Sequence, residues 1–112
     1  MNPTDIYSMT LSTLTKARSV MLSPEWQAAL DAATAPQRVA ASRELVKVEQ
    51  AILALANESL SDIAAAMQAN EQGLTQATSA LTNTLSDITK VQNVIQAVTN
   101  VLNVVAKILP LL

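Results

Sequence analysis

Two pairs of carboxylates are the residues whose types and spacing could form an acid/base site. Glu44 lies five residues before Glu49, and Glu58 lies four residues before Asp62. Paired carboxylates act as general acid and general base when their surroundings push their pKa values apart. Both pairs lie in charge-rich helical sequence, however, where such residues are typical of a solvated helix face with weak local ion pairs. We therefore predict no catalytic residue in either pair.

The amino-acid inventory argues against most other chemistry. The chain of 112 residues has no Cys, no His and one Gly. Without Cys and His there is no thiolate nucleophile, imidazole base, disulfide or usual zinc site. A single glycine cannot build a glycine-rich phosphate-binding loop. The sequence therefore predicts a non-enzymatic protein with no catalytic residue, cofactor or metal ion.

The charges are few and unevenly distributed. Seven Lys and Arg oppose nine Asp and Glu, which gives a net charge of −2. There is no basic stripe of the kind that neutralises phosphates, so we expect no nucleic-acid partner. After Glu71 the charged residues are Asp87, Lys90 and Lys107. The C-terminal part is rich instead in Thr, Asn, Gln and Ser, and an almost uncharged surface favours association.

No segment reads as a targeting or membrane-spanning sequence. The first ten residues carry Asp5 and lack both a positive n-region and a continuous apolar h-region. The charge-free stretches 72–86 and 91–106 are interrupted by Gln and Asn and are shorter than about 20 apolar residues. We expect no cleaved Sec signal and no conventional membrane-spanning helix. The compartment stays open between the cytoplasm and export by a signal-less route.

Three combinations of a capping residue with proline predict helix starts in the first third of the chain. They are Asn2-Pro3, Ser23-Pro24 and the capping box Thr34-Ala35-Pro36-Gln37. They predict two short N-terminal helices, over 3–21 and 24–33, within an N-terminal unit of residues 1–35. Trp26 is expected to anchor this unit. A third helix is predicted to begin near Pro36.

Apolar residues recur at every seventh position of the remaining segment, 36–112. This heptad series consists of Val39, Val46, Leu53, Leu60, Met67, Leu74, Leu81, Ile88, Ile95, Leu102 and Leu109. Such spacing is typical of a coiled-coil seam. In the first half, Leu45, Val48, Ile52 and Leu55 supply an adjacent apolar row, which is more typical of a helical bundle.

Two architectures fit the heptad series. Either residues 70–73 form a tight turn, with Gly73 as its left-handed residue, between two antiparallel helices over about 36–72 and 74–109, or the helix continues through Gly73 as one rod. The turn is favoured because polar Asn70 and the one Gly coincide where a turn would divide the segment in two, and a Gly inside a helix costs about 1 kcal/mol. The predicted fold is therefore all-α: a long antiparallel, coiled-coil-like helical hairpin with a turn near Gly73, preceded by two short N-terminal helices in an elongated bundle. Each arm would be roughly 54 Å long.

The C-terminal segment is the candidate functional region. Its apolar and uncharged polar residues separate onto two faces of a helix. The interface is predicted at Leu81, Ile88, Val91, Ile95, Val98, Leu102, Val105 and Leu109. Three roles are open for this apolar face: packing against the third helix in a core, contact with another subunit or partner, and insertion into a membrane. The apolar tail Pro110-Leu111-Leu112 is expected to dock on a partner subunit or near Trp26.

The Ala-rich hairpin with its β-branched apolar segment is similar in general character to pieces of α-helical pore-forming toxins and to small secreted hairpin proteins of bacterial secretion systems. A Trp-x-Gly turn is absent, since Trp26 is followed by Gln27 and Ala28. The leading hypothesis is a homo-oligomeric, non-enzymatic protein whose C-terminal amphipathic helix contacts copies of itself or a protein partner in a larger assembly. The alternative is a membrane-active, pore-forming-like component that inserts this helix.

Overall fold

Proline and a capping side chain begin each of the first two helices. In the computed structural model, which describes residues 1–109, α1 spans Pro3–Met21 and α2 spans Pro24–Asp31. The Asn2 side chain accepts a hydrogen bond from the backbone N–H of Asp5 at 2.8 Å. The Ser23 hydroxyl accepts one from the backbone N–H of Trp26 at 3.2 Å. These contacts satisfy amides that the first helical turn leaves unpaired, and they confirm both predicted starts.

The third helix, α3 (Ala35–Asn57), begins with the predicted capping box. The Thr34 hydroxyl accepts from the backbone N–H of Gln37 at 3.2 Å, and the Gln37 side chain accepts from the backbone N–H of Thr34 at 3.0 Å. The Arg38 guanidinium donates to the carbonyl of Ala33 and joins this turn to the end of α2. The cap and the arginine together fix the angle at which the chain enters α3.

The long hairpin predicted for 36–112 is wrong, because each arm is interrupted. Glu58, with φ −87° and ψ 143°, separates α3 from α4 (Leu60–Ala69). The loop 85–90 separates α5 (Glu71–Thr84) from α6 (Val91–Val105). Both interruptions hold short polar residues whose side chains bond locally: the Ser86 hydroxyl donates to the Asn83 carbonyl at 2.6 Å. Such bonds compete with helical backbone pairing, which is why the helix ends there.

Gly73 is not a turn residue. It is the third residue of α5, and no residue in the described part of the chain has a positive φ. The turn lies at Asn70, between α4 and α5, where the Asn70 side-chain amide donates to the Ala66 carbonyl at 2.8 Å. The polar residue ends the helix here, and the nearby glycine is part of the next one.

Replacing Gly73 with Ala is therefore expected to stabilise the protein. A Cβ at this position would lie 3.5 Å from Val104 Cγ1, an ordinary van der Waals contact. Alanine restricts the unfolded chain and suits a helix, so we expect the free energy of unfolding to rise by about 0.5–1 kcal/mol. Urea unfolding followed by circular dichroism measures the change. A left-handed Gly73 would instead make Gly73→Ala destabilising, and that result would contradict the structure.

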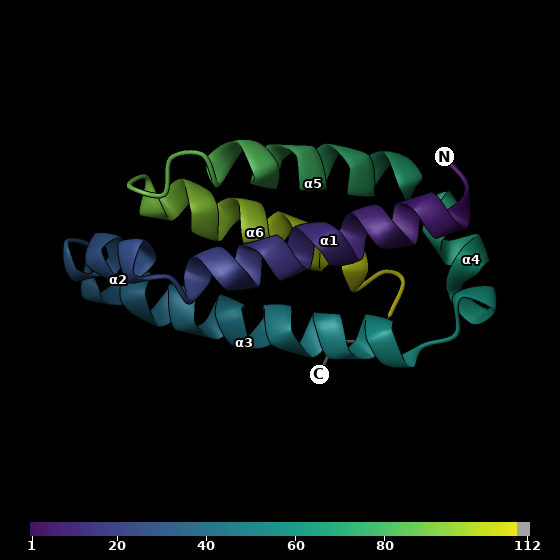
Figure 1. Ribbon diagram of the computed structural model, residues 1–112, viewed down its shortest axis with the longest axis horizontal. Coiled ribbons are helices and arrows are strands. Elements are labelled where there is room, and N and C mark those ends of the chain that lie inside the picture. The colour runs from purple at the N-terminus through teal and green to yellow at the C-terminus, as the bar shows by residue number, and fades with distance from the viewer. Residues whose placement is uncertain (110–112) are drawn as a thin grey trace.

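Four long helices lie side by side, as Figure 1 shows: α1, α3, α5 and α6. The helix α1 packs against α3 and α5, and α6 packs against the same two helices. At one end of the bundle α2 joins α1 to α3, and at the other end α4 carries the chain from α3 to α5. Each of the consecutive long pairs α1/α3 and α5/α6 is antiparallel. The result is an all-α bundle of 43 × 25 × 19 Å.

One core runs through this bundle and receives side chains from all six helices. Ile6 and Leu14 of α1 are fully buried, so the N-terminal helix is a full member of the bundle and not a short cover on its face. Trp26 of α2 is 1% exposed, which confirms its predicted anchoring role. The Tyr7 hydroxyl donates to the Leu55 carbonyl at 2.8 Å and ties α1 to the end of α3. Residues 1–35 thus share their core with the rest of the described chain.

Candidate interaction surface

The residues predicted as an interface lie in the protein's own core. Leu81 of α5 and Val91, Ile95, Val98, Leu102 and Val105 of α6 are buried, as is Leu109, while Ile88 in the loop 85–90 is half-buried. Their partners are side chains of the same chain, since α6 packs against α3 and α5. Of the three roles left open for the C-terminal segment, core packing is the one this arrangement fills. A contact with another molecule through these residues would require the bundle to open. The tail 110–112 lies outside the described residues.

The other face of α6 is polar and uncharged. Gln92, Asn93, Gln96, Asn100 and Asn103 are exposed. The Gln96 side chain donates to Asn100 Oδ1 at 3.0 Å, one helical turn away. This face therefore satisfies part of its hydrogen bonding within itself.

The heptad series divides between the core and the surface. Met67, Leu74 and Leu81 are fully buried, but Val39, Val46 and Leu53 on α3 are 59%, 56% and 62% exposed. We call these last three residues the α3 stripe. The expectation that these three residues face the core together with the adjacent row of Leu45, Val48, Ile52 and Leu55 is wrong.

The physical reason is that α3 carries two sets of apolar residues. Its core face consists of Ala41, Glu44, Val48, Ala51 and Leu55, spaced alternately by three and four residues. Val46 and Val48 are two positions apart, about 200° around a helix, so the α3 stripe points away from the core. The interruption at Glu58 ends α3, and α4 starts with a new rotational phase. The seven-residue spacing of Leu53, Leu60 and Met67 therefore does not place these residues on one continuous helix face.

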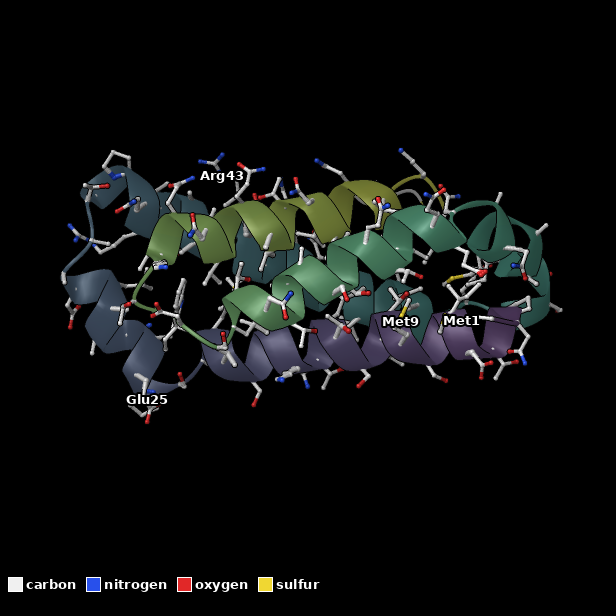
Figure 2. The ribbon with its side chains drawn as sticks, turned by 90° about the horizontal axis from the view of Figure 1, so that it is seen from above. Met1, Met9, Glu25 and Arg43 are labelled. Carbon is white, nitrogen blue, oxygen red and sulfur yellow. The ribbon has the colours of Figure 1, made fainter. Side chains whose placement is uncertain are left out.

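The charges beside the α3 stripe differ between its two edges. Arg43 lies between Val39 and Val46 along the helix, and Figure 2 shows its side chain projecting away from the bundle. Within residues 1–109, Arg43 has no hydrogen-bond or ion-pair partner. Lys47 lies on the same edge, and exposed Glu49 lies on the other. The exposed aliphatic side chains of the α3 stripe thus lie beside the Arg43 guanidinium, which has no partner within residues 1–109.

Glu44 is a buried carboxylate on the core face of α3. Its side chain is 9% exposed, and its Oε1 lies 3.6 Å from Lys47 Nζ. Its Oε2 has no hydrogen-bond partner among residues 1–109. Glu49, with which Glu44 was paired as an acid/base candidate, is exposed on a different side of the helix. The structure therefore does not bring these two carboxylates together, and we expect Glu44 to destabilise the core.

The surface of the described chain also has several open clefts, which gather few reactive groups. One of them, of about 570 Å³, lies between the end of α4 and the start of α5 and is lined by Gln68, Ala69, Glu71, Gln72, Thr75 and Gln76. In residues 1–109 no three metal-ligating side chains come together. Among those same residues, no helix has the length and apolar character needed to cross a membrane.

The loop 85–90 holds a carboxyl whose pKa is lowered by its neighbours. The Thr89 hydroxyl donates to Asp87 Oδ1, and this bond, helped by the Thr89 backbone N–H and the Lys90 charge, holds the pKa of Asp87 below its ordinary value. The Asp87 side chain is 50% exposed. Its hydrogen bonds shape the turn into α6.

The α3 stripe could have been found from the sequence by comparing the two apolar sets on α3. Ala41, Val48 and Leu55 have the same seven-residue spacing as Val39, Val46 and Leu53, so each set fits a core face equally well. Two opposite faces of one helix cannot both face one core.

Comparison of the chain with protein-family models, with curated proteins and with solved structures finds no match.

Proposed function

We propose that the protein is a non-enzymatic binding module, and that the α3 stripe is its interaction surface. The observation that carries the proposal is that Val39, Val46 and Leu53, all more than half exposed, lie on one line of a single helix. Scattered apolar side chains are normal on a protein surface, whereas apolar side chains gathered on one face suggest a contact site. Apolar anchors at helical spacing are the usual means by which one helix binds another.

The surroundings of the stripe support the same proposal. The core face of α3 already fixes the helix in the bundle, so the outer residues are not needed to hold it there. Gln50 and Arg43 lie among the aliphatic residues. Arginine is enriched among the residues that dominate binding energy at protein interfaces. The function we propose is therefore assembly with another protein chain.

One part of the expectation from the sequence changes in this proposal. The interface moves from α6 to α3, because α6 is occupied by intramolecular contacts. Self-association stays a prediction, and so does the membrane-active alternative. If self-association or membrane insertion uses α6, the buried residues of α6 must leave the core. That step removes the contacts that α6 makes with α3 and α5.

Site-specific crosslinking in the cell tests the proposed surface. A photoreactive amino acid placed at Val46 is expected to give discrete adducts, while the same residue at exposed Ser79 of α5 is not. Adding Leu53→Asp to the Val46 probe is expected to lower adduct yield about tenfold or more, because an interface anchor contributes at least about 1.4 kcal/mol.

The probe at Ser79 is the matched control, since it lies on a helix of the same bundle but far from the α3 stripe in sequence. Equal adduct patterns from the two positions, or adducts at Val46 that survive Leu53→Asp at full yield, would contradict the proposal. Circular dichroism of each variant verifies that the bundle remains folded.

A further inference from the structure

The residues along the outer face of α3 follow the pattern of a two-helix seam. Val39, Arg43, Val46, Gln50 and Leu53 are spaced by four, three, four and three residues. This alternation keeps side chains on one line facing a second helix. Two of the five positions are polar, and a polar residue within such a seam selects the partner helix. The chemistry of Arg43 and Gln50 therefore specifies what covers the stripe.

Arg43 is the more selective of the two. It is exposed, lies between two aliphatic residues of the stripe, and has no acidic partner within the described chain. Lys47, on the same edge, has Glu44 as its neighbour at 3.6 Å. A guanidinium that becomes enclosed in a contact needs a carboxylate, which it binds through two parallel hydrogen bonds. The partner must supply that carboxylate.

The α3 helix of a second copy does not supply it. A parallel pair of α3 helices would place Arg43 level with Arg43 of the other copy. In an antiparallel pair, Val46 of one helix can lie opposite Val46 of the other. The edge of one α3 helix that carries Arg43 and Lys47 then faces the same edge of the second α3 helix. Two arginines and two lysines would line that side of the contact. Like charges facing each other across a contact oppose association.

We infer that the α3 stripe receives an amphipathic helix of a different protein, which carries aliphatic residues on its seam and carboxylates on the edge that faces Arg43 and Lys47. This inference rests on the proposed function and names the partner's chemistry. The aliphatic seam supplies contact area to Val39, Val46 and Leu53, and the acidic edge supplies orientation and specificity.

Three synthetic helical peptides test the inference. Each peptide is 21 residues long and has leucines along the seam that faces the α3 stripe. The three peptides differ only at the positions on the edge that faces Arg43 and Lys47, where they carry Glu, Gln or Lys. Fluorescence anisotropy against the full chain is expected to show that the Glu peptide binds at least tenfold more tightly than the Gln peptide, and that the Lys peptide binds weakest. Arg43→Glu is expected to reverse this order. Lys16→Glu, the control, makes the same kind of charge change at an exposed site on α1 and is expected to preserve it.

The outcomes separate this inference from the proposed function. Equal affinity of the three peptides, with binding lost in Val46→Asp, would overturn the acidic partner and leave the α3 stripe as the interaction surface. Binding of none of the peptides would overturn the inference, while the crosslinking at Val46 decides the proposed function independently. Sedimentation could instead show that the wild-type chain forms an oligomer and that the Val46→Asp variant is a monomer. That result would overturn the inference and identify a second copy as the partner.

Discussion

Ile95→Asp is expected to unfold the bundle, whereas Val46→Asp is expected to leave it folded. The two residues belong to the same heptad series, so the sequence pattern alone treats them as equivalent. Ile95 is 5% exposed in the core of α6, and Val46 is 56% exposed on α3. An unpaired carboxylate in the core costs about 3–5 kcal/mol, a large part of the roughly 5–15 kcal/mol that stabilises a domain. A surface substitution changes stability by about 0.5 kcal/mol.

Thermal and urea unfolding, followed by far-ultraviolet circular dichroism, measure both variants. Ile95→Asp should lose its cooperative transition, and Val46→Asp should keep a midpoint close to that of the wild type. Ile95→Val, which keeps an apolar side chain in the core, is the conservative control and should cost about 0.5–1.5 kcal/mol. If Val46→Asp were the variant that unfolds, α3 would have to face the core through the stripe, and the structure would be wrong.

Glu44→Met is expected to stabilise the protein by about 1–3 kcal/mol. The Glu44 side chain is 9% exposed, and one of its oxygens has no hydrogen-bond partner. A single cation 3.6 Å from one oxygen recovers only part of the hydration that the carboxylate loses on burial, so an apolar side chain of similar volume is favoured. Lys47, whose side chain is 47% exposed, remains solvated when Glu44 is replaced.

The matched control for this prediction is Glu49→Met. Glu49 is exposed on the same helix, so its replacement should change the free energy of unfolding by about 0.5 kcal/mol at most. Urea midpoints at neutral pH give both values. A loss of stability in Glu44→Met would contradict this account and would mean that the Glu44 carboxylate makes a favourable contact in the core.

The helix starts were the most predictable part of the fold. Asn2, Ser23 and Thr34 specify their helices through hydrogen bonds to residues three positions ahead, so the necessary information is local. The all-α class follows equally from composition and pattern. The turn predicted over residues 70–73 lies at Asn70, but the left-handed role predicted for Gly73 is wrong. In the structure the polar side chain ends α4, while the glycine occupies an ordinary helical position.

The candidate interface was less predictable because it depends on which face of each helix meets the others. A seven-residue spacing identifies a face only while the helix continues, and the interruption at Glu58 breaks the series between Leu53 and Leu60. The buried small residues Ala41 and Ala51 let α3 pack closely, which a count of large apolar residues does not reveal. Long-range packing thus decided which apolar set on α3 remained exposed.

Thiol labelling tests the central claim most directly, because the natural chain has no cysteine. Val46→Cys and Ile95→Cys place one thiol on the α3 stripe and one in the core. With Ellman's reagent, the thiol at position 46 should react at nearly the rate of the unfolded chain. The thiol at position 95 should react at least about 100-fold more slowly, since it must wait for the bundle to open. Equal rates at the two positions, or slower labelling at position 46, would contradict an exposed α3 stripe and a buried α6.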